Sequence, residues 1–410
     1  TLGRGQREKT KSVTLRDYLL YNATAEPESN THYFISPSST LEPSSSVSGN
    51  SLYPLTDYIT DEQFSTSHRA FLAAITNSSE PKNFKDAMQH DVWKKAVGKE
   101  VVALEDSNTW DITELPPGKE AIGCLWIFKI KYNADGTVER HKARLVVNGK
   151  SQIEGEDYKE TFAPVVKMTT VRALLRIVAA KQWEVYQMDV QNAFLHGDLE
   201  EEVYMKLPPG FRHSHPNKVC RLRKSLYGLK QAPRCWFKKL SDALIRFGFV
   251  QSYEDYSLFS YERNGLELRV LVYVDDLLIC GSDPHMVKRF KEYLSKCFAM
   301  KDLGKLKYFL GIEVSRGPEG IFLSQRKYAL DIIADTGYLG SKPVATPLEQ
   351  NHNLAKSKAP LLPDPTKYRR LLGRLIYLLN TRPELSYSVH LLSQFMQAPT
   401  EEHWSAALRV

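Results

Sequence analysis

The sequence predicts an α+β fold with an antiparallel sheet at its centre. Three features predict it: short apolar segments of strand length, amphipathic segments of helical period between them, and turn residues that join neighbouring strands. From residue 184 to about residue 314 the order is strand, helix, strand hairpin, helix, strand. An antiparallel sheet that carries helices on one face accommodates this order. The 410 residues are enough for two or three domains.

The first 80 residues are predicted to be a disordered linker. They are rich in Ser, Thr and Pro, and residues 36–51 read SPSSTLEPSSSVSGNS. Such a composition buries too little apolar surface to offset the entropy of ordering the chain. Order is expected to begin near Asn83. Apolar residues at helical spacing then predict a helix; they are Trp93, Ala96, Val97, Val101 and Leu104.

A β-hairpin is expected next, from residues 126–132 and 138–147, because the Asp-Gly step within residues 133–136 is a hairpin turn signal. Alternation places Trp126, Phe128 and Ile130 on one face. The other face carries the cations Lys129, Lys131, Arg140, Lys142 and Arg144. From these residues alone, the cationic face is either a phosphate-binding surface or the solvated outer side of an edge hairpin.

The elements after residue 184 follow from the apolar pattern. Strands are predicted at residues 185–190, 268–274 and 277–280, helices at 232–249 and 285–298, and a hairpin at 308–314 with 321–325. From residue 326 onward the pattern is mostly helical, with a loop-rich interruption over residues 343–365.

Positive charge is concentrated in one basic run, residues 211–241, which contains no Asp or Glu. The aromatic residues Tyr227, Trp236 and Phe237 are interleaved with its cations. A solvated helix face usually mixes both signs of charge, so this run favours a position beside phosphates, with an ordinary solvated surface as the alternative. The net charge of +7 agrees with a polyanionic partner without requiring one.

The cysteine pattern and the hydropathy exclude several classes of protein. The five cysteines form no CxxC pair, so neither a disulfide framework nor a zinc site is expected, and a reducing compartment is the simpler interpretation. No apolar run approaches about 18 residues, so no membrane span is expected.

The residues that indicate chemistry are two groups of carboxylates at strand ends. Asp275 and Asp276 are adjacent between two apolar strands, where like charges repel and no Gly assists the turn. Asp189 lies near the end of the strand at 185–190, and two strands of one sheet can bring it to Asp275. Carboxylate oxygens are the ligands that Mg²⁺ prefers, and two such ions are a common device of phosphoryl transfer. The alternative is an exposed acidic turn.

Several collinear motifs carry a family resemblance. The run QMDVQNAFL at residues 187–195 and YVDD at 273–276 resemble two catalytic motifs of copia-type LTR retrotransposon reverse transcriptases. SLYGLKQAPR at 225–234 is similar to the segment that lies against template and incoming nucleotide in that family. Further matches, in the family's order, are KARLV at 142–146, ETFAPV at 160–165, residues 204–211 and YFLGIEV at 308–314.

The resemblance implies a role for each matching residue. Asp189, Asp275 and Asp276 would be the catalytic, metal-binding carboxylates, and Phe194 the gate that excludes a ribose 2′-hydroxyl. With Phe194, the expected nucleotide-binding residues are Lys129, Lys131, Lys142, Arg144, Tyr227 and Gly228. The expected template and primer contacts are Lys230, Gln231, Pro233, Arg234, Leu310 and Gly311. Lys301 would be a candidate general acid. If the resemblance is set aside, the simpler interpretations are a core aromatic for Phe194, a turn glycine for Gly228 and a solvated lysine for Lys301.

The resemblance also implies an architecture and partners. The implied architecture is that of a right-hand polymerase. Residues 83–183 would be the fingers and N-terminal helices, and residues 184–325 a palm with a ferredoxin-like sheet. Residues 326–410 would be a helical thumb or connection that stops before ribonuclease H. Residues 1–80 would be the tail after integrase. The expected partners are an RNA template, a DNA primer–template duplex, deoxynucleotides, two Mg²⁺ ions with Mn²⁺ as a substitute, and the integrase and ribonuclease H segments of the same polyprotein. The expected location is intracellular, in cytoplasmic virus-like particles, with the nucleus as a second compartment.

Three functions remain open at this stage. The first is RNA- and DNA-directed DNA polymerisation from a primer 3′-hydroxyl. The second is a degenerate or co-opted retrotransposon fragment that binds nucleic acid without polymerising. The third is another two-metal enzyme on a similar sheet, such as a nucleotide cyclase, which would not need the motif at residues 225–234.

Overall fold

A computed structural model describes residues 80–132, 137–211 and 218–410 of the chain. The predicted linker at residues 1–80, apart from Glu80, and the predicted hairpin turn at 133–136 lie outside the described residues. The described chain forms two compact units, one of residues up to 159 together with 201–230, and one of residues 160–200 together with 231–410. This division cuts across the segments 83–183 and 184–325 that the resemblance suggests.

The first unit combines the predicted hairpin with a small sheet. Its helices are α3 (Phe84–Ala87), α4 (Asp91–Asp106) and the 3₁₀ turn η3 (Gly149–Ser151). Strands β2 (Cys124–Tyr132) and β3 (Val138–Val147) form the hairpin, and a second sheet has the order β1 (Trp110–Glu114), β6 (Lys218–Leu222), β5 (Tyr204–Lys206). The predicted helix is confirmed as α4, which buries Trp93, Ala96, Val97 and Leu104. The predicted hairpin faces are also confirmed, because Trp126, Phe128 and Ile130 are buried while their neighbours are not.

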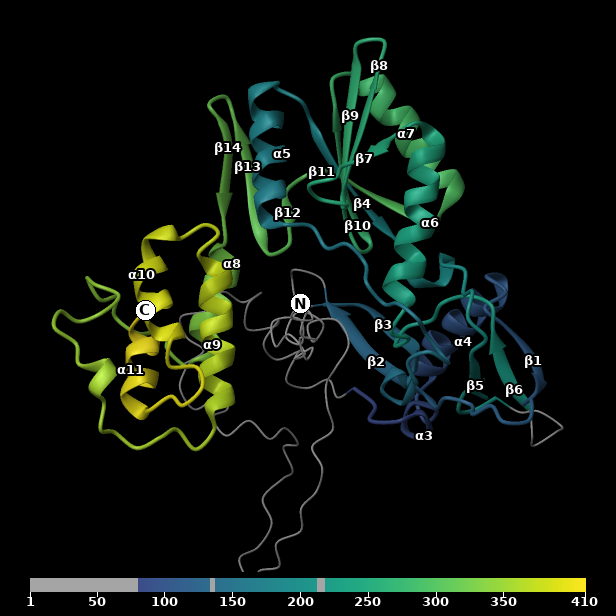
Figure 1. The fold of residues 1–410 in the computed structure, drawn as a ribbon, viewed down its shortest axis with the longest axis horizontal. Coiled ribbons are helices and arrows are strands. Elements are labelled where there is room, and N and C mark those ends of the chain that lie inside the picture. Colours follow the sequence, from purple (N-terminus) through teal and green to yellow (C-terminus); the bar gives the residue numbers. More distant parts are fainter. Residues whose placement is uncertain (1–79, 133–136, 212–217) are drawn as a thin grey trace, which may run out of the picture. The chain divides into compact units, whose positions relative to one another are not determined.

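The second unit is built on a six-stranded antiparallel sheet (Figure 1). The strand order is β11 (Met300–Lys305), β4 (Val185–Val190), β10 (Asp276–Gly281), β9 (Leu266–Tyr273), β8 (Leu258–Arg263), β7 (Val250–Gln251). Helix α6 (Ala232–Phe247) leads into β7 and follows β5 and β6 in the chain, and α7 (Pro284–Cys297) connects β10 to β11. The α+β class is therefore confirmed, and the order β11-β4-β10-β9 is that of a βαββαβ, ferredoxin-like sheet.

Both faces of this sheet are covered, whereas helices on only one face were predicted. Helices α6 and α7 pack on one face through residues such as Trp236, Leu240 and Phe290. Helix α5 (Met168–Ala180) packs on the other face through Leu174 and Val178, beside the hairpin strands β13 and β14 (Figure 1). The prediction of one covered face was wrong because α5 precedes β4 in the chain and is not part of the strand–helix alternation. Strands buried on both sides explain the continuous apolar runs in β9 and β10.

The remaining elements form a hairpin and a helical region. The predicted strand at residues 308–314 is interrupted by a turn, giving β12 (Tyr308–Phe309) and β13 (Ile312–Gly317), which pairs with β14 (Gly320–Ser324). Helices α8 (Arg326–Asp335), α9 (Pro365–Leu378), α10 (Ser386–Ser393) and α11 (Glu401–Arg409), with the 3₁₀ turns η5 (Leu354–Lys356) and η6 (Pro383–Leu385), surround a core of Tyr368, Leu372 and Leu392. Among the described residues, no helix combines the length and apolarity that crossing a membrane requires.

Candidate active site

The strand register brings two of the three predicted carboxylates side by side. Strand β4 lies between β10 and β11, and Asp189 of β4 pairs directly with Asp276 of β10. Met188 and Val190 belong to the core under α6 and α7, so the intervening Asp189 points to the opposite face. Directly paired residues of antiparallel strands have Cβ atoms about 4.5–5.5 Å apart. The meeting of Asp189 with the acidic pair, predicted from the sequence, is thus found at the end of the sheet.

The turn that carries Asp275 has a costly backbone conformation held by two hydrogen bonds. Tyr273 and Asp276 are paired, so Val274 and Asp275 form a two-residue turn, and Val274 has φ of 54°. A β-branched residue rarely adopts this left-handed conformation. The indole Nε1 of the buried Trp236 donates to the Val274 carbonyl at 2.6 Å, and the amide of Val190 donates to the Asp275 carbonyl at 2.8 Å. The turn is therefore fixed against both α6 and β4, with Asp275 next to Asp189 and Asp276.

The three carboxylates repel one another. Burial, together with the negative charges of Asp275 and Asp189, raises the pKa of Asp276 to about 6, and a hydrogen bond of 3.2 Å that Gln187 Nε2 donates to Asp276 Oδ1 acts in the opposite direction. Gln187 is on the same face of β4 as Asp189, two residues earlier. This arrangement favours a bound cation, because a divalent ion would allow all three groups to ionise together.

Whether the site fits magnesium depends on the atoms that its side chains offer as ligands. Asp189, Asp275 and Asp276 offer only oxygen ligands, as Mg²⁺ requires. Within residues 80–132, 137–211 and 218–410, no group of three or more His, Cys, Asp or Glu side chains is already arranged as a metal-binding set. The residues therefore fit the ion in chemistry, while the coordination geometry is not formed in the structure.

Lys301 lies in the same row of the sheet. It pairs with Asp189 from β11, so Lys301, Asp189 and Asp276 occupy adjacent positions on three neighbouring strands. Its side chain is exposed. The structure thus places the candidate general acid beside the carboxylates.

Phe194 follows β4 in the 3₁₀ turn η4 (Ala193–His196). The turn begins after Asn192, which has φ of 50°, and the His196 ring lies 5.8 Å from Trp236 and 5.5 Å from Phe298 between ring centroids. Phe194 is partly buried against the core under α6 and α7. Its position is compatible with both the gate and the core-aromatic interpretations.

In the first unit, Gly228 is explained by a close approach within the protein. It has φ of 92°, and a Cβ there would lie 2.1 Å from the Val147 carbonyl oxygen. Gly149, which the sequence analysis did not identify, also approaches Gly228 closely: a Cβ at Gly149 would lie 2.0 Å from the Gly228 carbonyl oxygen. The Val147 amide also donates to the Tyr227 carbonyl at 2.8 Å. The two glycines therefore allow the segment around Tyr227 to pack against the end of β3.

The cationic face of the β2–β3 hairpin is only partly neutralised. Lys129 forms an ion pair of 2.7 Å with Glu80, whereas no acidic group within 4 Å is found among the described residues for Lys131, Lys142 or Arg144. Burial, followed by the charges of Arg144 and Arg140, lowers the pKa of Lys142 to about 8. The Arg144 guanidinium lies 4.4 Å from the centroid of the Tyr227 ring, and its buried Nε has no hydrogen-bond acceptor in the described chain. The charge of the buried Glu100 of α4 acts on both Lys142 and Arg144, although the Arg144 Nε donor finds no acceptor there.

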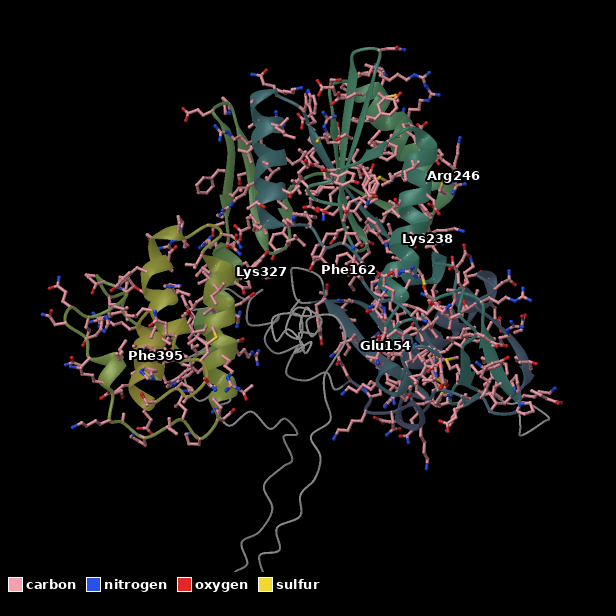
Figure 2. All side chains as sticks on the ribbon, viewed as in Figure 1. Glu154, Phe162, Lys238, Arg246, Lys327 and Phe395 are labelled. Carbon is pink, nitrogen blue, oxygen red and sulfur yellow. The ribbon has the colours of Figure 1, made fainter. Side chains whose placement is uncertain are left out.

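The cations of the basic run at residues 211–241 are, by contrast, mostly paired with acidic side chains. The structure sets six of its cations against acidic side chains from other segments: Lys218–Glu114, Arg221–Glu202, Arg223–Asp111, Arg234–Glu160, Lys238–Glu200 and Lys239–Asp198. Lys238 and Arg246 lie on the side of α6 away from the sheet (Figure 2). The absence of Asp and Glu in the run thus reflects partners that are distant in sequence, and this favours the solvated-surface alternative over the phosphate-facing one.

The predicted template and primer residues in this run also have partners within the protein. Lys230 Nζ donates to the Gln152 carbonyl at 3.2 Å and to the Tyr158 hydroxyl at 3.3 Å, above the Tyr158 ring. Gln231 is fully buried, and Pro233 starts α6. Leu310 and Gly311 form the turn between β12 and β13. Contacts within the protein therefore account for the presence of Lys230, Gln231 and Pro233, whereas Leu310 and Gly311 lie in an irregular turn.

The structure adds residues that sequence reasoning missed. Gln187 could have been found from its alternation with Asp189, because it lies on the same strand face. Trp236 and Val274 depend on a contact between distant segments, for which the sequence contains no signal.

Comparison with known proteins identifies the family. Residues 107–350, more than half of the chain, match the family described as reverse transcriptase (RNA-dependent DNA polymerase). The chain therefore belongs to the reverse transcriptase family, a class of nucleotidyltransferases.

Within that family the chain resembles the Pol polyproteins of copia-type retrotransposons. It is 47% identical to the Retrovirus-related Pol polyprotein from transposon RE2 of Arabidopsis thaliana over 83% of the chain and 24% of that protein. It is 47% identical to the Pol polyprotein from transposon RE1 of the same plant over 82% of the chain and 23% of that protein, and 37% identical to that from transposon TNT 1-94 of Nicotiana tabacum over 86% and 27%. The resemblance inferred from the motifs is confirmed, and the chain spans about a quarter of the length of these relatives.

Proposed function

We propose that this chain is an RNA-directed and DNA-directed DNA polymerase that adds deoxynucleotides to a primer 3′-hydroxyl. The observation that carries the proposal is the register of Asp189 with Asp276 across β4 and β10, with Asp275 in the adjoining turn. Family membership supports the reaction class, and the names of the relatives place such segments in retrotransposon Pol polyproteins.

The proposed mechanism assigns the carboxylates the binding of two Mg²⁺ ions, or Mn²⁺ in their place. Bound divalent ions would activate the primer hydroxyl and stabilise the leaving pyrophosphate oxygens. Asp189 and Asp275 would hold both ions, and Asp276 would support them from β10. Gln187 would keep Asp276 in position through its hydrogen bond. Lys301, beside Asp189, would donate a proton to the departing pyrophosphate.

The remaining sites are proposed from the family. Phe194 would restrict the sugar 2′ position. Lys129, Lys131, Lys142 and Arg144 would hold the phosphates of the nucleotide and of the template, and Tyr227 and Gly228 would contact the nucleotide. Lys230, Gln231, Pro233, Arg234, Leu310 and Gly311 would contact template and primer. Residues 83–183, 184–325 and 326–410 would be fingers, palm and thumb, and the chain would act inside an intracellular particle with the integrase and ribonuclease H parts of its polyprotein.

Primer extension tests the proposal. The native chain is incubated with oligo-dT on poly-rA, dTTP and Mg²⁺, beside the variants Asp275→Asn and Asp242→Asn. Asp275→Asn should abolish extension, because the carboxylate binds metal and does not pack a core, while Asp242, exposed on α6, should be replaceable without loss. Normal extension by Asp275→Asn would refute the site. A native chain that binds the duplex with strong salt dependence but adds no nucleotide would favour the non-polymerising alternative.

A further inference from the structure

The turn between β12 and β13 has a backbone that needs an external constraint. Its two residues, Leu310 and Gly311, have φ of 51° and 76°. Gly311 adopts this region readily, but Leu310 does so only at a cost in free energy. Strained residues of this kind persist when the surrounding structure over-determines them.

The constraint comes from helix α9. The Tyr377 hydroxyl donates a hydrogen bond to the Leu310 carbonyl oxygen. The ring of Tyr377 also packs on the turn, because a Cβ at Gly311 would lie 3.7 Å from its Cε1. Tyr328 of α8 meets Tyr377 edge-on at 5.3 Å between ring centroids, so the Tyr377 ring is itself held in place.

On its other side, the turn is connected to the carboxylates through aromatic side chains. Phe309, next to Leu310, is 2% exposed, and its ring lies 6.5 Å from that of Tyr273. Tyr273 pairs with Asp276 across the catalytic turn. A continuous set of contacts therefore runs from α9 through Tyr377, Leu310, Phe309 and Tyr273 to the acidic turn.

The base of the hairpin is fixed by separate bonds. Glu313 accepts from the Ser324 hydroxyl at 3.1 Å and from the Lys327 amide at 3.0 Å, where β14 leads into α8 (Figure 2). Gln325 accepts from the Thr381 hydroxyl at 2.8 Å. These bonds hold the base whether or not the turn is held. The hydroxyl of Tyr377 can therefore be removed without releasing the hairpin.

We propose that Tyr377 is a positioning residue that ties the β12–β13 turn to α9, so that the helical region α8–α11 sets the place of the primer end relative to Asp189, Asp275 and Asp276. This rests on the proposed function, in which Leu310 and Gly311 contact the primer. Tyr377 touches neither substrate nor the carboxylates and acts through the Leu310 carbonyl. Loss of its hydroxyl leaves that carbonyl without its donor, which loosens the turn while the ring packing remains.

The test compares three tyrosine-to-phenylalanine variants in the full chain. Tyr377→Phe removes the hydroxyl that donates to the turn and keeps the ring. Tyr328→Phe removes a hydroxyl of the same aromatic cluster that donates at 3.4 Å to the Arg374 carbonyl and not to the turn. Tyr387→Phe changes a side chain of α10 that is 72% exposed. Amide hydrogen exchange at residues 308–313 and steady-state primer extension are measured for all three.

For Tyr377→Phe, exchange at the amides of residues 310–312 should accelerate roughly three- to tenfold, the loss expected for one hydrogen bond. The KM for primer–template should rise, and fewer nucleotides should be added per binding event, while the KM for dNTP stays unchanged. The two control variants should match the native chain in every measurement. Exchange or primer–template KM in Tyr377→Phe equal to that of Tyr328→Phe would overturn the inference. A native chain that extends no primer would refute the proposed function, and the exchange measurement would still decide whether Tyr377 holds the turn.

Discussion

The carboxylates at the β9–β10 turn and the cations of the basic run are both single-sign groups in the sequence, but their surroundings differ. Asp189, Asp275 and Asp276 face one another, and the hydrogen bond to Asp276 comes from the neutral Gln187. Six cations of residues 211–241 instead face acidic side chains from segments distant in sequence. The first group is set beside its own sign of charge, whereas the second group is set against the opposite sign.

The cationic face of the β2–β3 hairpin resembles the carboxylates more than it resembles the basic run. Lys142 and Arg144 are partly buried beside each other, and the lowered pKa of Lys142 results from that burial and from neighbouring cations. Like charges set beside one another therefore distinguish these two groups from the paired surface of the basic run, which a count of charged residues does not. Each prediction below compares a group that lies beside like charges with a group paired to the opposite charge.

The largest effect is expected at the carboxylates. Asp189→Asn should lower the rate of primer extension by roughly a hundredfold or more, because the charge that the transition state requires is lost. Asp198→Asn, which removes an acid already paired with Lys239, should leave the rate unchanged. Single-turnover extension with saturating Mg²⁺ measures both. Equal losses in the two variants would mean that the carboxylates set beside one another have no special role in the reaction.

The pH dependence of stability gives a test that does not need activity. The folded pKa of Asp276 is raised above its value of 3.8 to about 6, so its protonated form stabilises the fold below pH 3.8, and that contribution is lost as pH rises through 6. Without metal, Asp276→Asn should therefore stabilise the chain by about 1–2 kcal/mol at pH 8, and by much less at pH 4, after allowance for partial solvent screening. Urea unfolding at both pH values measures the difference. A gain that is the same at both would contradict the raised pKa.

Magnesium should reverse the stability difference between the native chain and Asp276→Asn. At pH 8 the ion is expected to raise the melting temperature of the native chain, because it binds the folded state alone, and to raise that of Asp276→Asn less. At pH 5, where a proton occupies Asp276, the effect of magnesium on the native chain should shrink. A magnesium effect that is independent of both pH and Asp276 would place the ion elsewhere.

Much of this site could be predicted from the sequence because its signals are local. Asp189 ends an apolar strand, and Asp275 and Asp276 sit between two more, so period and turn chemistry made them candidates, and the resemblance of the motifs around them assigned their roles. The ion pairs of the basic run could not be foreseen, because its acidic partners, such as Glu114 and Glu200, are far away in the chain. For the same reason the bond from Trp236 to Val274, the contact of Gly149 with Gly228 and the second covered face of the sheet could not be foreseen, since each joins segments whose proximity only the fold creates.

A moderate effect is expected at the cationic hairpin face. Arg144→Ala should weaken primer–template binding and reduce the slope of log Kd against log salt by about 0.9 for each phosphate that the side chain no longer neutralises. Lys239→Ala should leave the slope unchanged, since Asp198 already neutralises that lysine. Arg144→Lys should keep the slope but lose the flat packing on Tyr227, which separates charge from stacking. Fluorescence anisotropy over a salt series measures all three, and an equal slope change for Arg144→Ala and Lys239→Ala would remove the distinction between the two basic regions.

The smallest effect is expected at the Lys239–Asp198 pair itself. Both side chains are partly exposed, at 38% and 56%, so solvent screens their attraction and ordering them costs conformational entropy. A double-mutant cycle of Lys239→Met and Asp198→Asn should give a coupling free energy of about 0.2–1 kcal/mol that declines as salt is added. Chemical denaturation at low and high salt measures it. A larger coupling that does not change with salt would mean that the basic run supports the fold in a way that ordinary surface pairs do not.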